Sequence, residues 1–156
     1  MKILIMGLSG SGKSTLAEKL SSILKAKWIN ADVVRKTDQN FDYSKAGRIN
    51  QAHRMKKLAD KKINQGHIVV ADFICPTVET RKIFNADFTI WMDTIAQCDF
   101  EDTNQMFEKP IVANGDDADI IIKEKNADAW VDTIIGRLYL FTTSFKLLIN
   151  EVKFSI

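Results

Sequence analysis

The stretch GLSGSGKST at residues 7–15 is the most informative part of this sequence. It holds three glycines and four hydroxyl residues, and it follows directly on the apolar run ILIM at residues 3–6. The spacing G-x4-G-K-S between a strand and a helix is typical of a phosphate-binding loop. Glycines let successive backbone N–H groups turn toward phosphate oxygens, and the following helix adds partial positive charge at its N-terminus. The stretch therefore predicts a nucleoside triphosphate site.

Individual residues of this loop have expected roles. The segment predicted to bind the nucleotide comprises Gly10, Ser11, Gly12, Lys13, Ser14 and Thr15. Lys13 is expected to reach the β- and γ-phosphates as a catalytic cation, and the Ser14 hydroxyl to complete the shell of a Mg²⁺ ion that bridges the same oxygens. ATP and Mg²⁺ are the cofactors that this pattern predicts.

Composition limits the other classes of function. The chain has 156 residues, 46% apolar and 27% charged, with 22 Lys and Arg against 20 Asp and Glu. This balance argues against a nucleic-acid partner or a membrane surface, and no apolar run approaches the ~18 residues that span a bilayer. The two cysteines, Cys75 and Cys98, form neither a CxxC pair nor a His-Cys cluster. We therefore expect a soluble, cytoplasmic protein that acts on a small molecule.

Short apolar runs alternate with longer helical patterns along the chain. The runs that predict strands are Lys2–Met6, Lys27–Asn30, His67–Asp72, Asp87–Asp93 and Ala118–Ile122. The patterns that predict helices are Lys13–Leu24, Ser44–Gln65, Thr77–Asn85 and Asn126–Ile135. Continuous apolar strands indicate burial on both faces. The pattern predicts an α/β protein with a mainly parallel five-stranded sheet that helices cover on both faces.

The longest of these helices and the C-terminal tail carry clear apolar stripes. In the helix, Ser44 is a predicted N-cap, Gly66 follows the C-terminus, and the stripe consists of Ile49, Ala52, Met55, Ala59 and Ile63. We expect residues 1–136 to form the P-loop domain and residues 137–156 an amphipathic extension. A second helix in the extension would begin near Thr142, Thr143 or Ser144, with the stripe Phe145, Leu148, Ile149, Val152 and Ile156. It would pack on its own domain or form a homodimer.

The kind of nucleotide-binding protein follows from two further observations. A GTPase is expected to carry an Asn-Lys-x-Asp motif that reads guanine, and this sequence has none. The second predicted strand ends in WINADVVR at residues 28–35, which brings Asp32 and Arg35 to the carboxyl edge of the sheet, where open α/β sheets bind ligands. This arrangement favours a kinase with an acceptor pocket.

Together these motifs resemble those of the adenylyl-sulfate kinases over roughly residues 1–135. The loop at residues 7–15 matches the family's GLSGSGKST. NADVVR at residues 30–35 is similar to its Asp-Gly-Asp-x-x-Arg, and Tyr43-Ser44 with Arg48, Gln51 and Arg54 is similar to its Phe-Ser-x-x-Asp-Arg-x-x-Asn-x-x-Arg. FICP at residues 73–76 is similar to its Phe-Ile-Ser-Pro.

The resemblance implies a three-layer P-loop kinase fold and transfer of the ATP γ-phosphate to the 3′-hydroxyl of adenosine 5′-phosphosulfate, as in sulfate assimilation. It implies a substrate pocket made by Asp32, Arg35, Arg48, Gln51 and the turn formed by Phe73, Ile74, Cys75 and Pro76. Paired hydrogen bonds from the two arginines suit a phosphosulfate. Phe73 either stacks on an adenine ring or belongs to the core, and Cys75 is expected to be a structural thiol.

Several departures from the family pattern leave the activity open. Asn30 stands where the family has the carboxylate that activates the acceptor hydroxyl. Asp32 is expected to act as a catalytic residue together with Asp72, which ends a buried strand and is expected to compensate as a catalytic and Mg²⁺-binding residue. In the lid segment Cys98–Lys109, Glu101 and Asn104 replace an arginine and a lysine, so that either Lys109 substitutes or the acceptor differs. The alternatives are a nucleotide-binding relative without turnover and a kinase of another nucleotide-like hydroxyl compound.

Overall fold

The computed structural model describes residues 1–111 and 118–153, with side chains described as far as residue 143. The strands are β1 (Lys2–Met6), β2 (Lys27–Asn30), β3 (Val69–Asp72), β4 (Phe88–Met92) and β5 (Ile120–Ile122). The helices are α1 (Lys13–Leu24), α2 (Ala31–Thr37), α3 (Lys45–Asn64), α4 (Val78–Phe84), α5 (Glu101–Met106) and α6 (Ala127–Lys153). The chain divides into two compact units, Met1–Lys125 and Asn126–Ile156.

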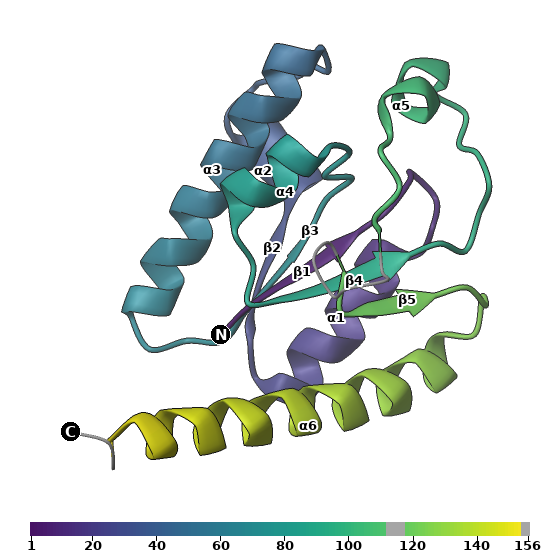
Figure 1. The fold of residues 1–156 in the computed structure, drawn as a ribbon. Coiled ribbons are helices and arrows are strands. Elements are labelled where there is room, and N and C mark those ends of the chain that lie inside the picture. Colours follow the sequence, from purple (N-terminus) through teal and green to yellow (C-terminus); the bar gives the residue numbers. More distant parts are fainter. Residues whose placement is uncertain (112–117, 154–156) are drawn as a thin grey trace. The chain divides into compact units, whose positions relative to one another are not determined.

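The first unit is built on a parallel sheet with the strand order β2-β3-β1-β4-β5. Helix α1 covers one face of this sheet, and α3 and α4 cover the other (Figure 1). All five residues of β1 and all four of β3 are buried, because helices remove both faces of the central strands from water. The predicted three-layer P-loop kinase fold with a five-stranded sheet is confirmed.

Helix α3 shows how local sequence signals determine an element of this fold. The Ser44 hydroxyl accepts a hydrogen bond from the Gly47 N–H at 3.1 Å, which satisfies one of the free donors of the first turn. Ala52, Met55 and Ala59 are fully buried, so the apolar stripe packs in the core. Gly66 follows the helix with φ of 82°, a left-handed conformation that glycine adopts without strain. These three predictions are confirmed.

Two short helices of seven and six residues, α2 and α5, were not predicted. Helix α2 begins directly after β2. The Asn30 side chain caps it by accepting a hydrogen bond from the Val33 N–H at 3.0 Å. The cap turns the chain sharply at the carboxyl edge of the sheet, which places Asp32 and Arg35 on a helix instead of on an extended strand end.

The predicted helix boundary near Gly136 is wrong, because α6 continues through this glycine to Lys153. A glycine inside a helix costs about 1 kcal/mol relative to alanine, which does not stop a helix whose flanking residues continue it. The predicted capping residues are also helical. Thr142 donates to the Leu138 carbonyl at 3.0 Å and Thr143 to the Tyr139 carbonyl at 2.8 Å. The side chains of the predicted stripe from Phe145 to Ile156 lie outside the described residues.

Gly47 is expected to be sensitive to substitution, because a Cβ at this position would lie 2.3 Å from the Asp42 carbonyl oxygen. We predict that Gly47→Ala lowers the free energy of unfolding by about 1–3 kcal/mol, measured by chemical denaturation. Gly136→Ala is the matched control. Its Cβ meets nothing within 4 Å, and alanine in a helix should be neutral or stabilising by up to about 1 kcal/mol. Equal stability of both variants would mean that the Asp42 turn moves freely away from α3.

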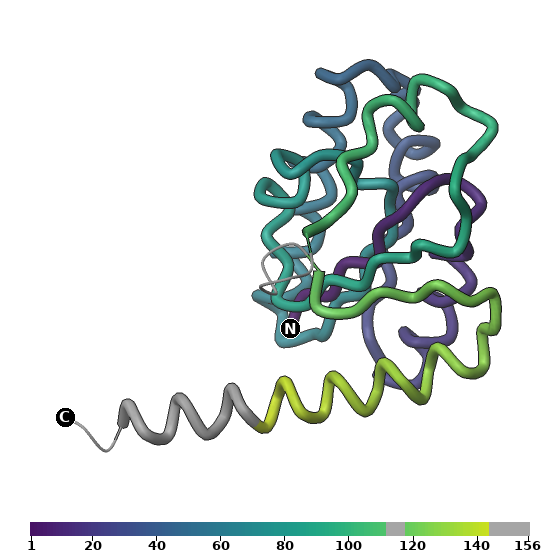
Figure 2. The backbone as a smooth tube through the Cα atoms, turned by 45° about the vertical axis from the view of Figure 1, so that its right-hand side comes forward, coloured from purple at the N-terminus to yellow at the C-terminus, as the bar shows by residue number. Residues whose placement is uncertain are grey.

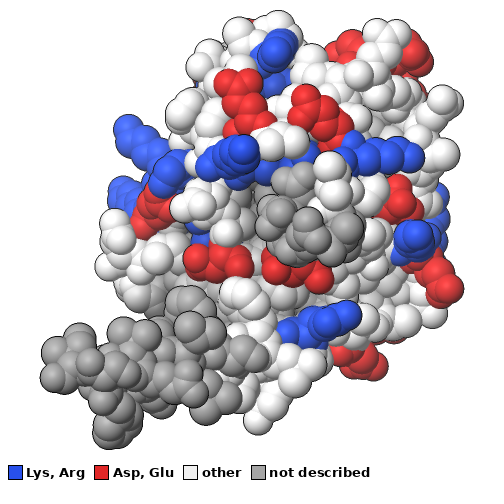
Figure 3. All heavy atoms as spheres, viewed as in Figure 1, with Lys and Arg blue, Asp and Glu red and all other residues white. Residues whose placement is uncertain are grey.

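The distribution of charge on the surface agrees with the near-neutral composition of the chain. Basic and acidic side chains are interspersed on the face drawn in Figure 3. Across residues 1–111 and 118–153, no helix is both long and apolar enough to cross a bilayer.

Candidate functional site

A pocket of about 380 Å³ lies at the carboxyl ends of β1, β2 and β3. Its volume is within the range of small-molecule sites. The lining residues are Ser9, Gly10, Gly12, Lys13, Ser14, Thr15, Ala31, Asp32, Arg35, Tyr43, Arg48, Gln51, Asp72, Phe73, Ile74, Cys75 and Pro76. Every predicted site residue except Ser11 lines this one pocket, although they come from four segments of the chain. Ser9, Ala31 and Tyr43 were not predicted.

The phosphate-loop segment enters the pocket from β1 and depends on its glycines. A Cβ on Gly7 would lie 2.6 Å from the Met92 carbonyl oxygen, so only glycine lets the loop leave β1 this close to β4. Gly10 and Gly12 have φ of 80° and 95°, which other residues rarely adopt. The predicted strand, loop and helix are therefore present in the order that a phosphate cradle requires.

Ser11 differs from the other predicted loop residues because it does not line the pocket. Its side chain is buried, its N–H donates to the Leu8 carbonyl at 3.2 Å, and its carbonyl accepts from the Thr94 hydroxyl at 2.7 Å. Both bonds join the loop to itself and to the segment after β4. Ser11 therefore holds the shape of the loop, and Thr94, just after β4, is the partner that sequence reasoning missed.

Lys13 begins α1 and is the cation of the phosphate end. Its ammonium donates to the Leu8 carbonyl at 2.6 Å. Burial lowers the pKa of Lys13 to about 8, although the nearby Asp72 and Asp32 carboxylates act to raise it. A buried ammonium with this pKa favours an anionic partner, because negative charge nearby would restore its charged form.

Asp72 lies beside Ser14 at the end of β3 and is only 2% exposed. Its Oδ2 accepts a hydrogen bond from the Ser14 hydroxyl at 2.7 Å, and the Asn30 amide donates to both carboxylate oxygens at 3.0 and 3.1 Å. In the sheet register Asp72 is the direct neighbour of Asn30 on β2. The carboxylate that the family pattern has at residue 30 is thus available one strand away.

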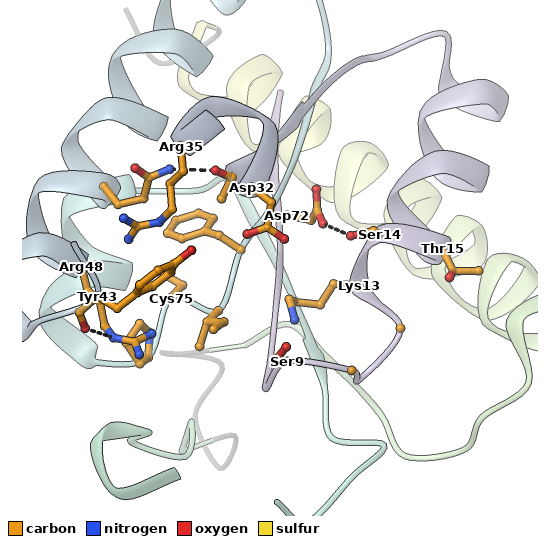
Figure 4. Close-up of a pocket in the computed structure, with 17 residues that line it drawn as sticks. Ser9, Lys13, Ser14, Thr15, Asp32, Arg35, Tyr43, Arg48, Asp72 and Cys75 are labelled. Atoms are coloured by element: carbon orange, nitrogen blue, oxygen red, sulfur yellow. Dashed lines mark hydrogen bonds between the residues drawn. The ribbon is translucent and has the colours of Figure 1, made fainter. Parts of the chain in front are cut away.

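The oxygen donors of Asp72 and Ser14 fit a hard cation such as Mg²⁺, which in such sites also binds phosphate oxygens and waters. No cluster of three or more His, Cys, Asp or Glu residues that could hold a metal occurs in the described parts of the chain. Figure 4 shows Lys13, Ser14, Asp32 and Asp72 grouped at one end of the pocket.

Arg35, Tyr43 and Arg48 form the opposite end of the pocket (Figure 4). The Arg35 guanidinium donates to the Asp42 carbonyl at 2.8 Å and lies 4.5 Å from the centre of the Tyr43 ring. Arg48 donates from Nε to the Tyr43 carbonyl at 2.9 Å. Both arginines are buried at the pocket wall instead of extending into solvent. Two held guanidinium groups beside an aromatic ring suit a planar, anionic acceptor.

The remaining predicted acceptor residues are held by the core. Gln51 donates to the Ala31 carbonyl at 3.2 Å and accepts from Arg54 at 2.6 and 2.9 Å. Phe73 packs edge to face on Phe84 at 5.3 Å and also lines the pocket, so it belongs to the core and to the site. Burial raises the pKa of Cys75 to about 12, which agrees with a structural thiol.

The lid segment Cys98–Lys109 extends beyond the carboxyl ends of the strands and contains α5 (Figures 1 and 2). Asp102 and Thr103 of this helix accept hydrogen bonds from the Arg48 guanidinium at 3.1 and 2.6 Å. Asn104 binds the Cys98 main chain, so it braces the lid itself. Lys109 is exposed and does not line the pocket. The contact of Arg48 with α5 was not predicted, since 54 residues separate Arg48 from Asp102.

Comparison with known proteins identifies the family and the fold of this chain. The model of the adenylylsulphate kinase family matches residues 1–116. Among solved structures, APS kinase from Mycobacterium tuberculosis in complex with AMPPNP and APS has a TM-score of 0.72 at 20% identity, over 88% of this chain and 96% of that chain. A sugar kinase from Janibacter sp. HTCC2649 has a TM-score of 0.70 at 12% identity, over 88% of this chain and 93% of that chain. Shikimate kinase from Aquifex aeolicus has a TM-score of 0.63 at 19% identity, over 89% of this chain and 96% of that chain. At these identities the structures demonstrate a shared fold, and no curated protein matches the chain.

Proposed function

Because this chain belongs to the adenylylsulphate kinase family, we propose that it transfers the γ-phosphate of ATP to the 3′-hydroxyl of adenosine 5′-phosphosulfate, a reaction of sulfate assimilation. The observation that carries the proposal is a single pocket that combines a phosphate loop at one end with Arg35, Tyr43 and Arg48 at the other. A donor nucleotide at the loop and an anionic acceptor at the arginines would meet at Asp32 and Asp72.

In this proposal each residue acts by position and charge. Lys13 binds the β- and γ-phosphate oxygens and stabilises the charge that grows on them during transfer. Asp72 and Ser14 would hold Mg²⁺, which neutralises phosphate charge when bound. Asp32 lies at the start of α2 in the same pocket and would accept a proton from the acceptor hydroxyl.

The acceptor pocket would bind adenosine 5′-phosphosulfate by complementary chemistry. Arg35 and Arg48 pair with the phosphosulfate, and the Phe73 ring offers an apolar face for a base. An assay of ADP release with ATP, Mg²⁺ and a panel of hydroxyl acceptors tests the proposal. We expect turnover with adenosine 5′-phosphosulfate to exceed that with shikimate, gluconate and adenosine by at least about a hundredfold. Tight ATP binding without turnover of any acceptor would favour a non-catalytic relative.

One observation favours a second candidate, a kinase of a less anionic nucleotide-like hydroxyl compound. The Asp102 carboxylate already neutralises part of the Arg48 charge, and the lid has Glu101 and Asn104 where the family has cations. Preference for a neutral acceptor in the same assay would select this alternative.

Asp102→Asn discriminates between these acceptors. The Asp102 side chain is 61% exposed, so its pairing with Arg48 is worth up to about 1 kcal/mol. If adenosine 5′-phosphosulfate competes for Arg48, the variant should lower its KM by about two- to fivefold and leave the KM of ATP unchanged. Asp99→Asn, another exposed carboxylate of the lid segment, is the control. A higher KM in Asp102→Asn would instead mean that Asp102 orients Arg48 for binding.

A further inference from the structure

The Asp72 carboxylate is held by three side chains, and two of them, Trp28 and Asn30, have no role in the proposed reaction. The Trp28 indole N–H donates to Oδ1 at 2.6 Å, while Asn30 donates to both oxygens and Ser14 to Oδ2. Trp28 is not a lining residue of the pocket. Its contact with Asp72 therefore acts on the site through the carboxylate alone.

The sheet explains why this contact forms. Strand β2 lies beside β3 in parallel register, with Trp28 opposite Val70 and Asn30 opposite Asp72. Residues 28 and 30 are two positions apart, so their side chains project from the same face of the sheet. The orientation of the Asn30 amide is determined separately, because its Oδ1 caps α2 at the Val33 N–H and its Nδ2 must then face Asp72.

Trp28 is poorly explained as a core residue. It is 41% exposed, whereas Trp91 and Trp130 are each 6% exposed. A tryptophan that leaves much of its ring in water gains little from burial, yet its N–H makes one of the shortest side-chain hydrogen bonds of the site. The specific contact of this side chain is therefore the hydrogen bond from its indole N–H, and not the burial of its ring.

We infer that Trp28 is a positioning residue that fixes the orientation of Asp72 for a metal–nucleotide complex. This inference rests on the proposed function. Trp28 donates to Oδ1, Ser14 donates to Oδ2 and Asn30 donates to both, so the carboxylate is held with Oδ2 beside Ser14 at the phosphate loop. Without the indole N–H, the carboxylate plane can rotate, because the terminal torsion of aspartate has a broad energy minimum. Partners of this kind commonly change metal affinity by about 10–100-fold.

The test is a calorimetric titration of the full chain with AMPPNP, in Mg²⁺ and in a chelator. Trp28→Phe keeps an aromatic ring and removes the N–H. We expect it to weaken AMPPNP binding in Mg²⁺ by about tenfold and to leave binding in the chelator within about twofold of the wild type. Trp130→Phe, the same substitution in α6, is the control and should change neither value. Thermal unfolding of each variant verifies that the fold is retained.

The outcomes separate this inference from the proposed function. If the wild-type chain binds AMPPNP no better in Mg²⁺ than in chelator, the metal site of the proposed function fails, and the role of Trp28 with it. If the wild type depends on Mg²⁺ and Trp28→Phe keeps the full dependence, only the inference about Trp28 is overturned. An equal loss in both media would overturn it as well, since Trp28 would then support the pocket as a whole.

Discussion

Lys13→Ala is expected to reduce phosphoryl transfer by at least about a thousandfold, the largest effect of any single substitution in this chain. Lys13 is the cation at the phosphate end of the pocket, 2.6 Å from the Leu8 carbonyl that its ammonium binds. Its removal leaves the charge that grows on the transferred phosphoryl group without its principal side-chain partner. ADP release under saturating ATP and acceptor measures the effect.

The fold should survive this substitution. Burial lowers the pKa of Lys13 to about 8, which means that its surroundings disfavour the ammonium in the absence of an anion. Alanine removes this unfavourable charge, so the free energy of unfolding should not fall. Lys57→Ala, an exposed lysine of α3, is the control and should keep full activity. Comparable activity in Lys13→Ala would contradict the assignment of residues 7–15 as a phosphate loop.

Asp72→Asn is expected to lower kcat by about 10²–10³-fold and to abolish the dependence of nucleotide binding on Mg²⁺. The substitution keeps the shape of the side chain and removes the negative charge beside Ser14. Both oxygens of Asp72 accept hydrogen bonds from N–H groups of Trp28 or Asn30. In the variant, the amide NH₂ replaces one of these oxygens and therefore faces another donor. The mismatch should cost about 1–3 kcal/mol of stability.

Asp87→Asn provides a matched control for Asp72. The Asp87 carboxylate accepts a hydrogen bond from the Lys2 N–H at 2.6 Å at the amino end of β4, outside the pocket. We expect this variant to lose stability and to retain metal-dependent nucleotide binding, measured by the same calorimetric titration. If Asp72→Asn also retains it, Asp72 is only a structural anchor between β2, β3 and α1.

The sequence predicts the fold and most of the site because their signals are local. The phosphate loop is nine consecutive residues between a strand and a helix, and the Ser44 cap is read from the first turn of α3. Parallel strands bring their carboxyl ends to one edge, so residues that follow β1, β2 and β3 were expected to meet. The pocket joins Lys13, Asp32 and Asp72 for this reason.

Pairings between distant residues depend on the tertiary structure. The sequence contains Trp28 and Asp102, but only strand register brings the indole to Asp72, and only the path of the lid brings Asp102 to Arg48. Helix α6 also differs from the sequence prediction, because a glycine and two threonines that suggested a break are helical. By itself, the sequence determined the backbone conformation of the phosphate loop and the edge of the sheet at which the site lies. Side-chain partners were decided by the folded chain, because a hydrogen bond needs a donor and acceptor within about 3 Å, a distance set by packing and not by spacing in the sequence.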